Sequence, residues 1–506
     1  MTNSLKPVLS GFHPDPSVCR VGGDLYLVTS TFEYFPGLPI YYSQNGRDWS
    51  LIGHGLHRTD ALPFKGREGD SSFLGIFAPT LRYHDGWFYI VTTNVGGGGN
   101  FLIKAREPSG PWSDPVWIDD ELFDPSLLFD DDGTVYYTRR GKEGIVQARM
   151  DIETGALLDI PVEIAKGFVS PDTEGPHLYH IGSYYYLMAA EGGTRFGHSV
   201  AIGRSTSPWG PFEACPHNPI LTHRHLSCHE VRDVGHGDLF QMEDGSWWMV
   251  MLGTRHARYE SFSHLGRETF LAPVTWSEDG WPIVNGSGTL EGLGSQQPQL
   301  ESSSVRYHFE GAELDRRWSY IRMPDLERYS LAERPGCLRL KGSATRLSDV
   351  ESPVWTGVRL QHMQAVITCK LEFRPRQEGE EAGLTAYMSS RYHTEAALTV
   401  QEGRRGLLFR QTFGEAKHEV FKPLEEGQSE SAVILELEAY PDIVKLYARL
   451  ADQTRVWLGN TDTSHLSQEL AGVWTGLMIG LYATGNGFDC HSPADFHWLE
   501  YEGLKL

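Results

Sequence analysis

The chain of 506 residues contains few cysteines, no long apolar run and no excess of positive charge. Its six cysteines form no Cys-x-x-Cys pair and have no regular spacing, which predicts free thiols rather than a disulfide framework. No window reaches about 18 consecutive apolar residues, so a transmembrane helix is not expected. The first residues lack the apolar segment of a signal peptide. We therefore expect a soluble protein of the cytoplasm that does not bind membranes.

The net charge of −22 excludes a further class of partner. Nucleic-acid backbones and anionic membranes attract basic surfaces, and the sequence contains no basic stripe. A hydrophobic fraction of 40% with 12% aromatic residues is typical of a folded chain rather than a disordered one. At this length one core is not enough, so two or three domains are expected.

What the chain does contain is a repeated motif in its first 300 residues. Five short related stretches, each followed by a turn and an apolar strand, occupy residues 13–17, 77–81, 123–127, 173–177 and 235–239. The strands that follow cover residues 25–30, 88–93, 135–140, 185–190 and 247–252, so their starts are 47 to 63 residues apart. A repeat of about 40–50 residues with several strands per unit is typical of a β-propeller blade. The spacing therefore predicts a five-bladed propeller.

The remaining residues follow a different pattern. The composition shifts at residues 286–304 toward glycine, serine and glutamine, as in a linker. Beyond it, short alternating runs with frequent turns predict strands, for example at 337–340, 364–373, 396–400 and 434–438. We therefore predict an all-β protein, with a five-bladed β-propeller at residues 1–300 and a β-sandwich of the jelly-roll or concanavalin type at residues 301–506.

The first, third and fourth motifs supply the carboxylates Asp15, Asp124 and Glu174. If every motif opens a blade at the central axis, these three groups meet in one pocket although they are far apart in sequence. One aspartate alone can cap a turn, but three charges at a narrow centre face desolvation and mutual repulsion. A pair of carboxylates flanking a bond is the apparatus of glycoside hydrolysis, one as acid and one as base. A third can raise the pKa of the acid.

Six runs of the chain resemble glycoside hydrolase family 43, most closely its branch of β-xylosidases and α-L-arabinofuranosidases with a C-terminal sandwich. They are SGFHPDPS at 10–17, STFEYFPG at 30–37, GIFAPTLRYH at 75–84, EGPHLY at 174–179, LGRETF at 265–270 and PADFHW at 493–498. The resemblance implies single-displacement hydrolysis with inversion, in which Asp15 is the general base and Glu174 the general acid. Asp124 would position the acid and raise its pKa. In an inverting enzyme the two working carboxyls stand about 6.5–9.5 Å apart, which leaves room for a water.

The resemblance also implies three contacts with the sugar. Arg267 matches an arginine that binds the sugar in the innermost subsite, and the alternative is an ordinary ion pair, for example with Glu268. Phe32 and Phe77 match aromatic walls of the pocket, although without the resemblance a core position is the better interpretation of each. Related sequences often carry tryptophan at the second position, so this chain departs from them there.

His236, in the fifth motif, matches a histidine under the active centre, and we expect it to support substrate binding. In several family members this histidine helps to hold a calcium ion among waters. Calcium prefers oxygen ligands, so one imidazole makes a weak site. We expect that no cofactor is required. The sequence does not decide whether a calcium ion binds at the propeller centre. His223, His225 and His229 lack a strict ligand spacing and are predicted to lie in a surface loop.

The predicted function is that of an inverting exo-glycosidase in xylan degradation, which releases xylose, L-arabinose or both from the non-reducing ends of xylo- or arabino-oligosaccharides. The expected partner is a small oligosaccharide. The sequence does not decide whether the chain forms a homo-oligomer. The alternative is a non-catalytic carbohydrate-binding propeller with a lectin-like sandwich, for which Glu174→Ala would leave function intact. A retaining fructosidase-type enzyme also has five blades and three acids, but its Asn-Asp-Pro-Asn opening is not found in this sequence.

Overall fold

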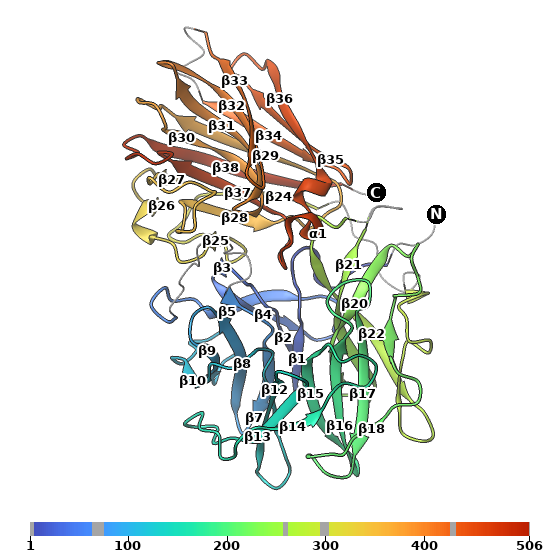
Figure 1. Cartoon of the computed structure of the whole chain (residues 1–506). Coiled ribbons are helices and arrows are strands. Elements are labelled where there is room, and N and C mark those ends of the chain that lie inside the picture. Colours follow the sequence, from blue (N-terminus) through green and yellow to red (C-terminus); the bar gives the residue numbers. More distant parts are fainter. Residues whose placement is uncertain (1–4, 63–74, 257–261, 294–302, 426–431, 505–506) are drawn as a thin grey trace.

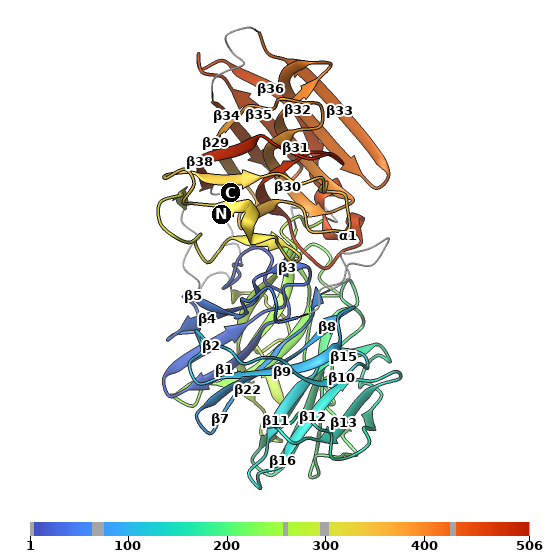
Figure 2. The ribbon, with the colours of Figure 1, turned by 90° about the vertical axis from the view of Figure 1, so that its left-hand side faces the viewer.

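The computed structural model describes residues 5–62, 75–256, 262–293, 303–425 and 432–504. Figures 1 and 2 show two β-rich parts, with the propeller below and the sandwich above it. The predicted all-β class and both predicted architectures are confirmed. The predicted boundary between residues 300 and 301 lies outside the described residues.

Five antiparallel sheets form the blades of the propeller. Blade 1 contains β1 (Ser17–Val21), β2 (Asp24–Val28), β4 (Gly37–Ser43) and β5 (Ser50–Leu56). Blade 2 contains β6 (Gly75–Ile76), β7 (Thr80–His84), β8 (Trp87–Val95), β9 (Gly99–Ala105) and β10 (Val116–Asp119). Blade 3 contains β11 (Ser126–Phe129), β12 (Val135–Arg140), β13 (Ile145–Arg149) and β14 (Val162–Ala165). Blade 4 contains β15 (Thr173–Ile181), β16 (Tyr184–Glu191), β17 (Ser199–Ser205), β18 (Glu213–Ala214) and β19 (Leu221–Thr222), and blade 5 contains β20 (Val231–Gln241), β21 (Trp247–Arg255), β22 (Arg267–Trp276) and β23 (Pro282–Val284).

The repeated motifs lie at or just before the first long strand of each blade, and the apolar strands predicted after them fall on β2, β8, β12, β16 and β21. Around the ring, β1 contacts β7, β7 contacts β11 and β11 contacts β15. The ring closes where β20 packs against β1 on one side and against β16 and β17 on the other. The five motifs therefore surround one central axis.

Neighbouring blades pack face to face, which explains why their middle strands are apolar along their whole length. One core joins blades 4 and 5 through Met188 and Ile202 on one side and Met249 and Phe270 on the other. A second core joins blades 1 and 2 in the same way. A strand that is covered on both faces needs a continuous apolar run rather than an alternating one.

The sandwich consists of two eight-stranded sheets. The first contains β24 (Ser304–His308), β26 (Tyr329–Ser330), β27 (Leu338–Lys341), β29 (Ala365–Phe373), β34 (Val433–Ala439), β35 (Ile443–Arg449), β36 (Arg455–Asp462) and β38 (Pro493–Gly503). The second contains β3 (Tyr34–Phe35), β25 (Ser319–Ile321), β28 (Trp355–Arg359), β30 (Glu381–Ser389), β31 (Tyr392–Gln401), β32 (Arg404–Phe413), β33 (Ala416–Pro423) and β37 (Met478–Thr484). Strand β29 alternates strictly between buried and half-buried residues, because only one of its faces meets the core between the sheets.

A strand from the propeller half completes the second sheet of the sandwich. Tyr34 pairs with Ile321 through the ladder between β3 and β25. Beside this ladder Arg322 lies 3.2 Å from Glu33, and both side chains are buried. The two parts are therefore joined by backbone hydrogen bonds and a buried ion pair, and the sandwich is held over the propeller.

The described helices are short: η3 (Leu326–Arg328), η4 (Thr463–Leu466) and α1 (Gln468–Ala471). In the described parts of the chain no helix has the length and apolar character needed to cross a membrane. All six cysteines are free thiols, which confirms the prediction from their spacing.

Candidate active site

The three carboxylates predicted to meet at the propeller centre approach one another. Asp15 lies two residues before β1, Asp124 two residues before β11, and Glu174 is the second residue of β15. The backbone N–H of Gly175 donates to Asp124 Oδ2 at 3.1 Å, which ties Asp124 to the residue beside Glu174. His236 Nδ1 of β20 lies 3.5 Å from Asp15 Oδ1. Four blades therefore contribute to one site.

The backbone is strained where these side chains enter the site. Asp15, Asp124 and His236 have φ values of 55°, 58° and 45°, in the left-handed region that residues other than glycine seldom adopt. Phe32 has a φ of 48°. Such conformations cost about 1–3 kcal/mol each and cluster at functional sites, where the surrounding structure enforces them.

Asp15 is held by two donors. Arg267 Nη1 donates to Asp15 Oδ1 at 2.9 Å, and Ser30 Oγ donates to Asp15 Oδ2 at 2.5 Å. All three side chains are buried. The guanidinium and the hydroxyl fix the orientation of the carboxyl group.

Glu174 has a different environment. Among the described residues no donor bonds to its carboxyl group, and the nearest cation, Arg140 Nη1, lies 3.9 Å from Oε2. Burial raises the pKa of Glu174 to about 7; the charges of Asp172 and Asp15 add to the rise, and Arg140 opposes it. Burial, followed by the charge of Glu174, also raises the pKa of Asp124 well above its usual value. The site therefore retains a proton near neutral pH.

Aromatic rings line the site from both parts of the molecule. The rings of Phe32 and Phe77 lie 4.9 Å apart, and the ring of Phe123 lies 5.8 Å from that of Phe77. The Arg267 guanidinium stands 5.4 Å from the Phe32 ring and 5.7 Å from the ring of Trp474, a sandwich residue, and Arg267 Nη2 donates to Trp474 O at 3.3 Å.

The sequence reasoning missed Ser30, which donates to Asp15, and four other residues near the site. Phe123 and Arg140 belong to the third repeat. Phe123 directly precedes Asp124, and Arg140 is the last residue of the predicted strand 135–140, so these positions could have indicated both residues. Asp172 lies two residues before Glu174 and ion-pairs with Arg140 at 3.3 Å. Trp474 carries no sequence signal, because it reaches the site only through the packing of the sandwich on the propeller.

His236 occupies a closely packed position below the carboxylates. A Cβ added to Gly175 would lie 2.7 Å from His236 Nε2, so only glycine fits next to this ring. Burial lowers the pKa of His236, which is therefore neutral near pH 7. The ring supports the site as a neutral group beside Asp15.

The residues around His236 do not fit a calcium ion. Asp238, two residues after His236, accepts hydrogen bonds from Arg82 Nη1 at 2.9 Å, from Ser17 Oγ at 2.6 Å and from Tyr179 OH at 2.7 Å. Asp15 is bound to Arg267. In the described chain the carboxylates closest to His236 are thus already neutralised by arginines, and no step of the reaction is assigned to a metal.

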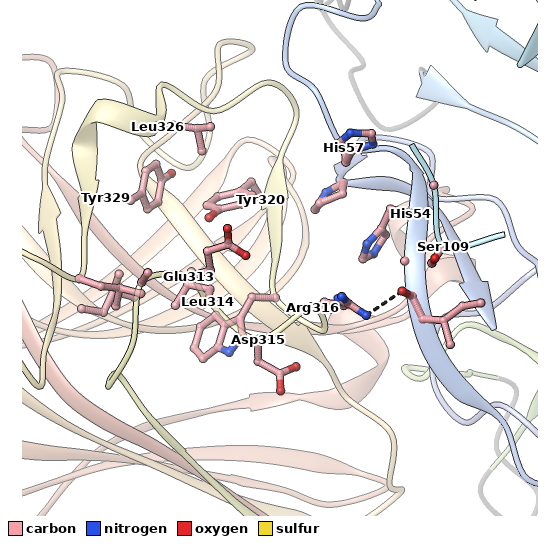
Figure 3. Close-up of a pocket in the computed structure, with 18 of the residues that line it drawn as sticks. His54, His57, Ser109, Glu313, Leu314, Asp315, Arg316, Tyr320, Leu326 and Tyr329 are labelled. Carbon is pink, nitrogen blue, oxygen red and sulfur yellow. Dashed lines mark hydrogen bonds between the residues drawn. The ribbon is translucent and has the colours of Figure 1, made fainter. Parts of the chain in front are cut away.

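A cavity of about 680 Å³ lies elsewhere, in the groove where the sandwich meets blade 1. Figure 3 shows Tyr320 and Tyr329 facing His54 and His57, and Arg316 reaching across the groove to donate to Ile52 O at 2.7 Å. The described residues that line it include none of the three carboxylates. The three carboxylates therefore lie outside this cavity.

A propeller with three converging carboxylates, in which burial raises the pKa of Glu174 to about 7, has the arrangement of a glycosidase. Sequence comparison agrees: the profile described as Glycosyl hydrolases family 43 matches residues 4–282, and that of the Beta xylosidase C-terminal Concanavalin A-like domain matches residues 306–502. The chain belongs to glycoside hydrolase family 43.

Curated relatives extend over the whole chain. The sequence is 42% identical to the non-reducing end alpha-L-arabinofuranosidase BoGH43B of Bacteroides ovatus, over 98% of this chain and 94% of that protein. It is 37% identical to a xylosidase/arabinosidase of Butyrivibrio fibrisolvens, over 98% of each chain. The solved structure of a xylan beta-1,4-xylosidase from Bacillus halodurans superimposes with a TM-score of 0.90 at 32% identity, covering 99% of this chain and 100% of the other.

Proposed function

We propose that this glycosidase releases single xylose or L-arabinose units from the non-reducing ends of short oligosaccharides, with inversion. The observation that carries the proposal is the contrast between two carboxyls in one pocket. Asp15 is held by Arg267 and Ser30, whereas burial raises the pKa of Glu174 to about 7. A base and an acid are thus available at the same pH. The names of both relatives and the walls of Phe32, Phe77 and Trp474 support an exo-acting enzyme for pentoses.

In the proposed reaction, Asp15 accepts a proton from a water as the water attacks the anomeric carbon. Glu174 donates its proton to the glycosidic oxygen as that bond breaks, so the leaving sugar departs neutral. Asp124, bound to Gly175 N, positions the acid through the backbone beside it. Arg267 binds the sugar hydroxyls next to Asp15, and the aromatic walls cover the sugar faces. Afterwards a proton moves from Asp15 to Glu174 through solvent.

Two measurements test this proposal. The purified chain should release nitrophenol from 4-nitrophenyl β-D-xyloside, from the α-L-arabinofuranoside, or from both. Proton NMR during the first turnovers of a xylo- or arabino-oligosaccharide should detect the inverted anomer first. Lack of activity on both aryl glycosides would overturn the substrate class, and first formation of the retained anomer would overturn the mechanism.

The cytoplasmic location is part of the same proposal. Six free thiols, two of them at least partly exposed at Cys228 and Cys490, fit a reducing compartment. Small imported oligosaccharides are the substrates available there. Fractionation of the source cells would test the location.

A further inference from the structure

A second cavity, of about 310 Å³, lies between the loop that joins β16 to β17 and the beginning of β20. Phe196 lines it from that loop, Arg224 from the segment after β19, and Arg232 and Asp233 from β20. Its volume is at the lower end of the range for small-molecule sites, about 300–1,000 Å³. None of these side chains takes part in the chemistry of the three carboxylates.

Contacts along the chain place this cavity on the side of the proposed acid. The β16–β17 loop begins beside Asp172, where Gly192 N donates to Asp172 O at 3.0 Å. Asp172 in turn pairs with Arg140, which faces Glu174. A general acid must face the oxygen of the leaving group, because it delivers its proton there. These contacts connect the loop that carries Phe196 to the side of the pocket on which the proposed acid lies.

The floor of the cavity is built like the active site. Asp233 has a φ of 55°, the same left-handed conformation as Asp15, and it lies where the register of β20 against β21 shifts. Bulges of this kind re-aim side chains next to active sites. His198 Nδ1 donates to Asp233 O at 2.8 Å, and its ring packs against Gly235, the residue before His236. The cavity floor thus contacts the segment of β20 that carries His236.

The sandwich fixes the wall that carries Phe196. The neighbouring Arg195 donates from Nη2 to Gln468 O at 3.3 Å and from Nη1 to Glu469 O at 3.4 Å, both in α1. Phe196 itself is 70% exposed, although it is large and apolar. The Phe196 ring is therefore accessible to a ligand that enters the cavity.

The chemistry of the lining matches a sugar. One face of a pyranose ring carries C–H groups that pack on an aromatic ring, and its edge carries hydroxyls that bind guanidinium and carboxylate groups. We propose that this cavity binds the leaving-group sugar, with Phe196 against its apolar face and Arg224, Arg232 and Asp233 on its hydroxyls. The Asp233 carboxylate is held in place for this by Thr254 Oγ1, which donates to it at 2.8 Å. This proposal rests on the proposed function, because it names the site that binds the second sugar of the same substrate.

The test compares two substrates that share the sugar to be released but differ in the leaving group. One is a pentose disaccharide, and the other is the glycosyl fluoride of the same pentose, whose leaving group is a single atom. For Phe196→Ala, the ratio of kcat/KM for the disaccharide to kcat/KM for the fluoride should fall about tenfold, mostly through KM. Phe196→Trp should restore the ratio, since it keeps an aromatic face.

The matched control is Phe488→Ala, which removes another exposed phenylalanine, on the sandwich. Arg232→Ala should lower the same ratio as Phe196→Ala. An unchanged ratio in both cavity variants, with the fold intact by circular dichroism, overturns the proposed subsite. A wild-type chain inactive on the fluoride and on the disaccharide would instead refute the proposed function, so the two failures are distinguishable.

Discussion

The propeller and the sandwich each bury a cluster of carboxylates, and the two clusters differ in where the arginine stands. In the sandwich, Arg410 lies between Glu381 and Glu395 and donates to Glu381 Oε1 at 2.7 Å and to Glu395 Oε2 at 2.5 Å. Burial alone would raise the pKa of Glu395, but Arg410 and His393 outweigh it and lower the pKa to about 2. In the propeller, Arg140 stays 3.9 Å from Glu174.

This difference distinguishes a carboxylate cluster that stabilises the fold from one that can donate a proton. An arginine in direct contact with both acids makes a closed network, in which Glu381 also accepts from Tyr482 OH at 2.7 Å. Such a network stabilises the fold as long as every member is present. An arginine kept out of hydrogen-bond range leaves Glu174 with a proton that it can donate.

The largest expected effect is on Glu174. Glu174→Gln removes the proton donor while keeping the shape of the side chain, so kcat on a disaccharide should fall by up to about 10⁴-fold. Hydrolysis of the glycosyl fluoride should fall far less, because fluoride leaves without protonation. Steady-state kinetics on both substrates measures the difference.

The same substitution in the other cluster is the control. Glu381→Gln should lower stability but leave kcat per folded molecule near that of the wild type. Equal losses of kcat in the two variants, or equal losses on the two substrates for Glu174→Gln, would contradict the assignment of the acid.

The second expected effect is on stability. Arg410→Met leaves two buried glutamates without their cation, so the free energy of unfolding at pH 7 should fall by about 3–5 kcal/mol. The folded-state pKa of Glu395, about 2, is below its unfolded value. Its contribution is therefore present above the unfolded pKa and is lost as pH falls toward 2, so the deficit should shrink in acid.

Urea unfolding at pH 7 and pH 4 measures this deficit. Arg404→Met, at an exposed position on the same strand, is the matched control and should cost little. A deficit that is the same at both pH values would contradict the role of the ion pair.

A third effect tests whether the sandwich contributes to the active site. Trp474→Ala removes a ring that stands 5.7 Å from the Arg267 guanidinium, and kcat/KM should fall about tenfold. The control is Trp457→Ala, which removes a sandwich tryptophan under Lys422, away from the propeller carboxylates. If both variants keep the wild-type kcat/KM, the sandwich ring has no part in binding the sugar.

The three carboxylates could be predicted from the sequence, whereas Trp474 could not. Repeat spacing predicts the blades, and one motif per blade places Asp15, Asp124 and Glu174 at the same end of the ring. Trp474 follows from no repeat, because its position depends on how the sandwich sits on the propeller. That packing depends on β3, a two-residue strand too short to produce a periodic signal. The distance between Arg140 and Glu174 likewise comes from tertiary packing.

The smallest effect tests the electrostatics of the acid. Glu174 acts when protonated, so activity should fall as pH rises through its pKa of about 7. The charge of Asp172 helps to raise that pKa and also occupies Arg140. Asp172→Asn should therefore lower the pKa and move the alkaline limb of the kcat/KM profile to lower pH by a fraction of a unit, since Asp172 is half exposed and solvent screens it. Asp131→Asn, on an exposed turn between β11 and β12 of blade 3, should leave the limb in place. A shift of the limb to higher pH in Asp172→Asn would mean that the acid is controlled by another group.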